Sequence, residues 1–395
     1  IGSCNVAVGY KTLYLNTTGV DNMAVGYNSM YANTTGRQNV ALGKNTLSAN
    51  VSGINNMAIG AYALSGNKAD ENTALGSTSL ESNTTGTQNV SIGAYSMRCN
   101  TTGNCNTAIG TRALYLNTTG VENVSIGACS LYSNTIGSYN TAIGTESLKA
   151  NTTGQCNVAI GYETLQCNVT GVYNTAIGYR VLTNNITSAN VGVGFCVLHA
   201  NTTGTGNVGV GTSVLRCNTT GSGNVAIGAE SSLANTSGQR NVAVGSGSLQ
   251  YNTIGSNNVA IGFNNMRMGT HADCNIAIGS YSLFNNQGDF NLGMGVNTLS
   301  SNDSGSYNIA FGIQSLTSNT TACYNIGIGY QSLYSNTTGQ YNIAMGYKTL
   351  YTNTTGVQNT AIGYESLKAN TIGGCNTAVG RDTLRSNTIG IRNTA

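Results

Sequence analysis

Hydrophobic and polar residues repeat along this chain with a period of 17 residues. An Asn recurs at Asn5, Asn22, Asn39 and onward to Asn393, which gives 24 anchors, and 20 of the 23 intervals between anchors are 17 residues long. The unit reads N-[V/T]-A-I-G-x-x-S-L-x-x-N-T-T-G-x-x. A short unit copied end to end is the signature of a repeat architecture, so the fold follows from one unit and its stacking.

Apolar residues alternate with small ones just after each anchor. With the anchor Asn counted as zero, position +3 is Ile, Val, Leu, Met or Phe in every complete unit, and position +1 is apolar or Thr. This period of two predicts a strand whose +1 and +3 side chains share a face, which we expect to form the core together with Leu or Met at +8. Position +2, which is only Ala, Gly or Ser, is then expected outside, under a second surface or tightly packed near a corner.

Two further columns predict corners of the coil. Position +4 is Gly in every complete unit, beginning with Gly9, Gly26 and Gly43, which indicates a positive φ or a backbone packed too closely for a Cβ atom. Position +11 is almost always Asn, a residue that enters the left-handed region cheaply and bonds the local backbone. The second corner of the coil is therefore predicted at this column, for example at Asn16, Asn33 and Asn100.

These columns predict an all-β fold, a parallel β-solenoid or β-roll of about 23 coils with 17 residues per coil. Coils spaced about 4.8 Å apart would form an elongated rod, in which the anchor Asn side chains pair from rung to rung. We expect one continuous domain over residues 1–395, a segment of a longer fibre. Units shortened by one residue near 66–72, 184–190 and 285–291 fit deletions in a loop.

Composition narrows the functional classes. Charged residues make up 7% of the chain, the formal charge is +3, and there is no Pro. A charge this low and scattered forms no basic tract, so nucleic acid is not an expected partner. No apolar run is long enough to span a membrane. Pro is expected to be absent where every backbone N–H is needed for a ladder bond.

The strand motif carries a family resemblance. Residues 157–161 and 224–228 both read N-V-A-I-G, and the unit continues with x-x-S. This resembles the YadA-like head repeats of trimeric autotransporter adhesins and is similar to repeats in phage and virus tail-fibre proteins, although the Asn-Thr-Thr-Gly corner makes the unit longer. The resemblance implies a left-handed parallel β-roll with three chains side by side, exposed on a cell or virion and adhering to host surfaces.

Eleven Cys fall on variable columns that we expect to face outward. Cys residues in the same column lie three or more coils apart, which is beyond the roughly 7 Å between Cα atoms that a disulfide tolerates. Two pairs, Cys99 with Cys105 and Cys156 with Cys167, are candidates for bridges across a corner. An odd number of Cys leaves at least one thiol free or joined to another chain.

Tyr is the other patterned residue, with 22 copies. Tyr on neighbouring rungs can stack, which either stiffens the coil or presents a surface for protein or sugar contacts. The candidate contact surface near the C-terminal end of the sequence consists of Tyr324, Tyr330, Tyr334, Tyr341, Tyr347 and Tyr351.

The sequence contains no recognisable cluster of residues for catalysis, cofactor binding or metal binding. His199 and His271 are predicted to lie about four coils apart, and the 13 carboxylates are scattered singly, so we expect no enzyme, no cofactor and no metal site. Sixteen of the +11 Asn residues begin an N-x-[S/T] triplet. These triplets are possible glycosylation sites, although turn chemistry explains them equally well.

Two functional hypotheses follow. The first is a structural and adhesive fibre shaft that self-assembles on a virion, tail or cell surface and mediates attachment or assembly. Its expected partner is the chain itself, as a homotrimer or an end-to-end filament, with a host surface or glycan as a further partner, and its expected location is extracellular. The alternative is an ice-binding β-solenoid that uses the Thr column at +12.

Overall fold

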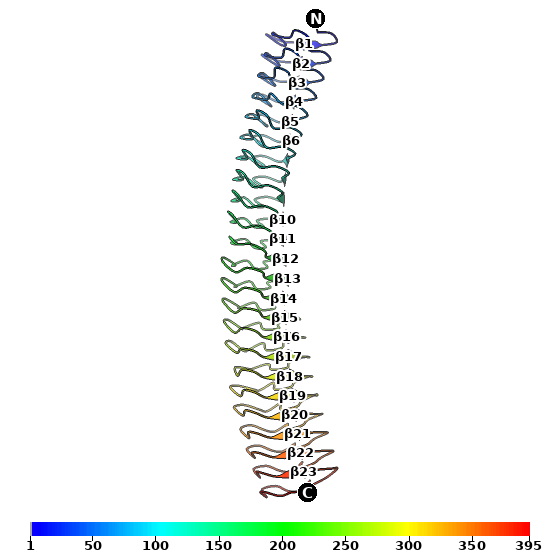
Figure 1. Ribbon diagram of the computed structural model, residues 1–395, viewed down its shortest axis with the longest axis vertical. Helices are drawn as coiled ribbons and strands as arrows, with labels where there is room; N and C mark the ends of the chain where they lie inside the picture. The colour runs from blue at the N-terminus through cyan, green and yellow to red at the C-terminus, as the bar shows by residue number, and fades with distance from the viewer. Residues whose placement is uncertain (1) are drawn as a thin grey trace. The chain divides into compact units, whose positions relative to one another are not determined.

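The computed structural model describes residues 2–395 and confirms the predicted parallel β-solenoid. Residues 2–395 contain 23 parallel strands, spaced by about one 17-residue unit, and no helix. The chain divides into two compact units, Ile1–Thr202 and Thr203–Ala395. In each unit the backbone winds through a stack of similar coils, with one short strand per coil (Figure 1). Residues 2–395 hold no helix that is both long enough and apolar enough to cross a membrane.

All strands occupy the same place in the repeat, directly after the anchor Asn. The strands of the first unit are β1 (Val6–Val8), β2 (Met23–Val25), β3 (Val40–Leu42), β4 (Met57–Ile59), β5 (Thr73–Leu75), β6 (Val90–Ile92), β7 (Thr107–Ile109), β8 (Val124–Ile126), β9 (Thr141–Ile143), β10 (Val158–Ile160), β11 (Thr175–Tyr179) and β12 (Val191–Phe195). Those of the second unit are β13 (Val208–Thr212), β14 (Val225–Ile227), β15 (Val242–Val244), β16 (Val259–Ile261), β17 (Ile276–Ile278), β18 (Leu292–Met294), β19 (Ile309–Phe311), β20 (Ile326–Ile328), β21 (Ile343–Met345), β22 (Thr360–Ile362) and β23 (Thr377–Val379).

Within each unit, successive strands pair in parallel and in register, so that each repeat column becomes a column in space. Ala7 lies beside Ala24, for example, and Ala24 lies beside Ala41. Backbone bonds between coils continue outside the strands, as from Leu13 N to Ser29 O at 3.1 Å. Each coil is therefore held to the next by hydrogen bonds on several sides, which is why one 17-residue unit needs its neighbours to be stable.

The face of the strand that points into the core is the opposite of the one that we expected. The +2 residues Ala24, Ala41 and Ala58 are fully buried, whereas the +1 and +3 side chains point outward and are half-buried or exposed. The core consists of Ala in most coils at +2, Ser or Thr in most coils and Ala or Val in others at +7, Leu or Met at +8, and the Asn columns at 0 and +11. Position +2 is small because it packs inside a narrow coil.

The left-handed backbone also lies elsewhere than we expected. The +11 Asn residues do not have positive φ values. Positive φ values in non-Gly residues occur at three other columns. These are the position just before the anchor, as in Asp21 (58°), position +6, as in Lys11 (53°), and position +8, as in Leu13 (49°). The coil therefore bends at columns whose residue types give no sequence signal for this conformation.

The three shortened units absorb their deletion in the loop, because strand register is kept across them, as between Met57 and Thr73. They also change the +11 Asn column. The Asn67 side chain keeps its local bond, to Ala69 O at 2.8 Å, but does not reach the preceding coil, and the buried Oδ1 atom of Asn50 has no hydrogen-bond partner. Asn185 likewise donates to Thr187 O, and Asn168 Oδ1 is left unpaired.

Candidate interaction surface

The outward face of the strands repeats one kind of chemistry along each unit. It consists of the +1 and +3 columns, and we call it the sheet face. Many of its side chains are more than a third exposed even though neighbours flank them along the column, as for Met23 at 44%, Ile261 at 38% and Phe311 at 52%. No Asp, Glu, Lys or Arg occurs in either column anywhere in the sequence. Large exposed patches of this composition mark interaction sites in soluble proteins.

The Gly column at +4 borders this face. The φ angles of Gly9, Gly26 and Gly43 are +130°, +131° and +138°, a region that residues with side chains rarely adopt. A Cβ atom on Gly9 would lie 2.5 Å from Gly26 O, and one on Gly43 would lie 2.8 Å from Gly60 O. Both reasons given for this column, a positive φ and close backbone packing, therefore operate together. Without side chains, the column forms a floor between the +3 and +5 side chains.

The +11 Asn column is a buried hydrogen-bond ladder. Asn33 Nδ2 donates to Asn16 Oδ1 at 2.9 Å and to Gly36 O at 3.2 Å, and Asn100 makes the same two contacts with Asn83 and Gly103. The expected local backbone bond is present, and the ladder adds a second role that we did not predict. The anchor Asn residues form the expected second ladder, for instance from Asn22 Nδ2 to Asn5 Oδ1 at 3.1 Å.

Burial of the +11 amides leads to a prediction about glycosylation. Asn33 and Asn100 are fully buried, and their Nδ2 atoms are engaged in the ladder, so a sugar on this nitrogen is incompatible with the folded coil. We expect the folded chain to carry no N-linked glycan at this column, even when it is secreted from a eukaryotic cell. Intact mass spectrometry before and after treatment with an N-glycosidase would check this, and a folded product that loses mass would contradict it.

All 11 Cys are free in the structure, including both candidate pairs, Cys99 with Cys105 and Cys156 with Cys167. The Cys105 thiol donates to Gln88 Oε1 at 3.3 Å on the preceding coil, and the Cys167 thiol points to Asn184 Oδ1 at 3.9 Å on the next. Burial raises the pKa of the Cys99 thiol, which makes it less reactive. The structure therefore forms neither of the two candidate cross-links.

The Tyr columns stack as expected, in three separate ladders. Tyr324 stacks on Tyr341 with ring centroids 5.1 Å apart, Tyr330 on Tyr347 at 5.4 Å, and Tyr334 on Tyr351 at 5.2 Å. The ammonium group of Lys348 lies over the rings of both Tyr347 and Tyr351, which connects two of the ladders. Each ring covers the face of its neighbour, so the ladders present ring edges and hydroxyl groups to solvent. This geometry leaves few ring faces for a sugar to stack on.

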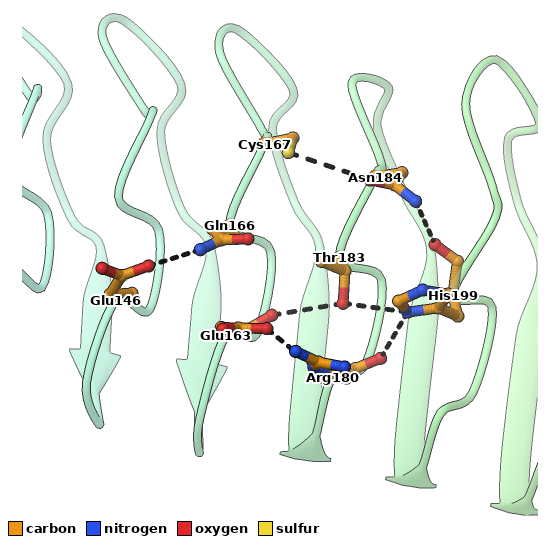
Figure 2. Close-up of polar contacts among 8 residues, drawn as sticks. All are labelled: Glu146, Glu163, Gln166, Cys167, Arg180, Thr183, Asn184 and His199. Atoms are coloured by element: carbon orange, nitrogen blue, oxygen red, sulfur yellow. Dashed lines mark hydrogen bonds and ion pairs between the residues drawn. The ribbon is translucent and has the colours of Figure 1, made fainter.

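A chain of polar contacts links successive coils of the first unit (Figure 2). Arg180 Nε pairs with Glu163 Oε2 at 2.7 Å, and the Thr183 hydroxyl donates to Glu163 O at 3.3 Å. Hydrogen bonds from Tyr162 and then Arg180 lower the pKa of Glu163. Gln166 Nε2 donates to Glu146 Oε2 at 2.6 Å on the neighbouring coil.

His199 closes this chain of contacts. Its Nδ1 atom lies 3.4 Å from Arg180 O and 3.2 Å from Thr183 Oγ1. A carbonyl oxygen can only accept, so a hydrogen bond to Arg180 O requires the tautomer in which Nδ1 carries the proton. In that tautomer the imidazole donates to Thr183 Oγ1 and the Thr183 hydroxyl donates to Glu163 O. These contacts tie coils together.

Metal ligands are not clustered. Among residues 2–395, no three His, Cys, Asp or Glu side chains converge in a way that would hold an ion.

The sequence matches no model of a known protein family and no curated protein.

Proposed function

We propose that this chain is a structural and adhesive fibre segment that packs side by side with copies of itself through the sheet face. The observation that carries the proposal is this face of Val, Ile, Leu, Met, Phe and Thr, which is uncharged throughout yet exposed in both units. A fibre shaft on a cell, virion or tail needs a self-associating surface that repeats along its length, and the resemblance to trimeric adhesin heads supports three chains side by side.

The size of the face is sufficient for a stable contact. Coils about 4.8 Å apart, with a face about 10 Å wide, supply roughly 50 Å² per coil. The 12 strands of the first unit therefore offer roughly 600 Å² and the 11 strands of the second roughly 550 Å², so contacts through both units together would exceed the roughly 800 Å² per partner of a standard interface. Burial of this face would remove exposed apolar side chains such as Ile261 and Phe311 from water, and that hydrophobic gain drives association.

Charged substitutions on the sheet face test the proposal. We expect light scattering to give a mass of two or more chains, and three if the family resemblance holds, under both oxidising and reducing conditions. The double variant Ile109→Asp and Ile261→Asp places one charge on the face in each unit. We expect it to be a monomer at micromolar concentration, because each buried unpaired charge costs several kcal/mol.

The matched control is Ile136→Asp with Ile254→Asp, which introduces the same charges at Ile side chains in the +13 corner that are 51% and 49% exposed. Circular dichroism should be unchanged in both double variants. A wild-type mass of one chain, or two double variants that associate equally well, would refute assembly through the sheet face.

Ice binding remains a second candidate because the +12 Thr residues do form a regular column. In that column, however, the Thr17 hydroxyl donates to Thr34 O at 3.0 Å and the Thr101 hydroxyl to Thr118 O at 3.0 Å. The hydroxyl protons are thus used within the stack. A fibre segment should produce no thermal hysteresis in a freezing assay.

A further inference from the structure

We propose that an apolar groove in the second unit receives Phe311 of a second copy of this chain and thereby fixes the register between neighbouring copies. The groove has a volume of about 390 Å³ and runs across β17, β18 and β19. This inference rests on the proposed self-assembly and goes further by naming the contact that selects one alignment.

The walls and floor of the groove follow from the repeat columns. The +3 side chains of Ile278, Met294 and Phe311 form one wall, and Ile313 at +5 stands opposite. The floor is the Gly column, at Gly279, Gly295 and Gly312. Because +3 is a ridge and +4 is a trough, two copies whose sheet faces meet can place the ridge of one in the trough of the other.

The chemistry and size of the groove fit a side chain of this kind. Every lining residue is apolar or Gly, so the site offers no charged group to a polar ligand. Its volume exceeds the roughly 150 Å³ that accommodates a benzene-sized guest, which leaves room for a Phe ring and part of a second side chain. Phe311 is 52% exposed beside the groove, on the sheet face that the proposed assembly buries.

Register is the property that the rest of the sheet face cannot supply. Val and Ile recur at nearly every coil, so two copies displaced by one coil would make almost the same contacts. Phe311 is the single Phe among the +3 residues of the chain, and the groove beside it is correspondingly distinctive. A unique knob and a unique hole on a repeating surface distinguish the correct alignment from its displaced alternatives.

The test uses the 395-residue chain with Phe311→Ala or with Ile313→Asp. The control is Ile254→Asp, because Ile254 and Ile313 are 49% and 50% exposed. The Gly floor is unsuitable for substitution, since a Cβ atom on Gly295 would lie 2.6 Å from Gly312 O. We expect the self-association constant, measured by dilution in the ultracentrifuge, to weaken by roughly 10-fold or more in both groove variants, as for a truncated interface hot spot. The control should match the wild type. Anilinonaphthalene sulfonate fluorescence should be low in the wild-type assembly and higher in Phe311→Ala.

Three outcomes would overturn the inference, and they are distinguishable. If the wild type is a monomer at all concentrations, the proposed function fails and the inference fails with it. If the wild type assembles but both groove variants associate as it does, only the register contact is wrong. If the assembled wild type binds one molecule of the dye per chain and the groove variants do not, the groove is open and its occupant is a small apolar ligand.

Discussion

Replacing Gly228 with Ala should destabilise the second unit by roughly 2–4 kcal/mol, because the new side chain would meet both a positive φ and the backbone of the next coil. Gly228 has a φ of +117°, and its Cβ atom would lie 2.8 Å from the carbonyl carbon of Gly245 and 3.0 Å from Ser246 N. Gly245 O accepts from Ser248 N at 3.3 Å and from Ser248 Oγ at 2.7 Å, and Gly245 N donates to Ile227 O on the preceding coil, so Gly245 cannot move without loss of hydrogen bonds. Hydrogen exchange across β14 and β15, together with urea unfolding, would measure the effect.

The matched control is Gly223→Ala, five residues earlier. Gly223 also has a positive φ, +68°, but its Cβ atom would meet nothing nearer than Arg240 Cγ at 3.5 Å. Other residues already occupy this column with similar angles, among them Cys156 at 55° and Arg240 at 54°. We expect a change of about 1 kcal/mol or less. Equal losses in the two variants would show that φ alone, and not the close approach of the coils, explains the invariant column.

The architecture could be predicted from the sequence because each column repeats a physical requirement more than twenty times. The Gly at +4 and the Asn at the anchor indicate positions that tolerate no other residue, and their constant spacing gives the coil length. Parallel pairing in register follows, because only stacking of like on like converts a sequence column into a spatial ladder. The strands confirm this register, as with Ala24 beside Ala41.

Which face of the strand points into the core could not be predicted by the same means. Alternation shows that +1 and +3 share a face, but it does not say which face is inside. Apolarity suggested that Ile and Val are buried, and this was wrong because a 17-residue coil is too narrow for large side chains from the strand as well as Leu at +8. Ala24 fits there, and the two Asn columns fill the remaining space with paired amides.

Because the inward and outward faces of the strand were exchanged in our prediction, the sheet face was not recognised as a candidate interaction surface. From the sequence alone, variable columns such as those of Tyr347 and the Cys residues resemble contact sites, whereas the sheet face resembles a core. The signal that was available is the complete lack of charge at +1 and +3, which a buried core and a buried interface share. Only the structure, in which Ile261 is 38% exposed, separates these two possibilities.

Replacing Asn140 with Ala should destabilise the first unit by roughly 2–6 kcal/mol, because it would interrupt the anchor ladder at a fully buried position. Asn140 Oδ1 accepts from both Asn157 N, at 3.0 Å, and Asn157 Nδ2, at 3.1 Å, while Asn140 Nδ2 donates to Gly154 O at 2.8 Å. Ala would leave Asn157 N unpaired in the interior, which costs roughly 1–3 kcal/mol. Asn157 Nδ2 and Gly154 O would each lose one bond, worth roughly 0.5–1.5 kcal/mol, and keep another, to Gly171 O and from Asn151 Nδ2.

The control is Asn55→Ala, since Asn55 is exposed and stands outside both ladders. Its replacement should change stability by about 1 kcal/mol or less. Hydrogen exchange gives the sharper measurement, because the loss should centre on β9 and β10 and decline over the neighbouring coils, as expected for a stack with nearest-neighbour coupling. A loss below about 1 kcal/mol in Asn140→Ala would mean that water replaces the missing amide. The Asn ladders would then specify the alignment of the coils without contributing most of their stability.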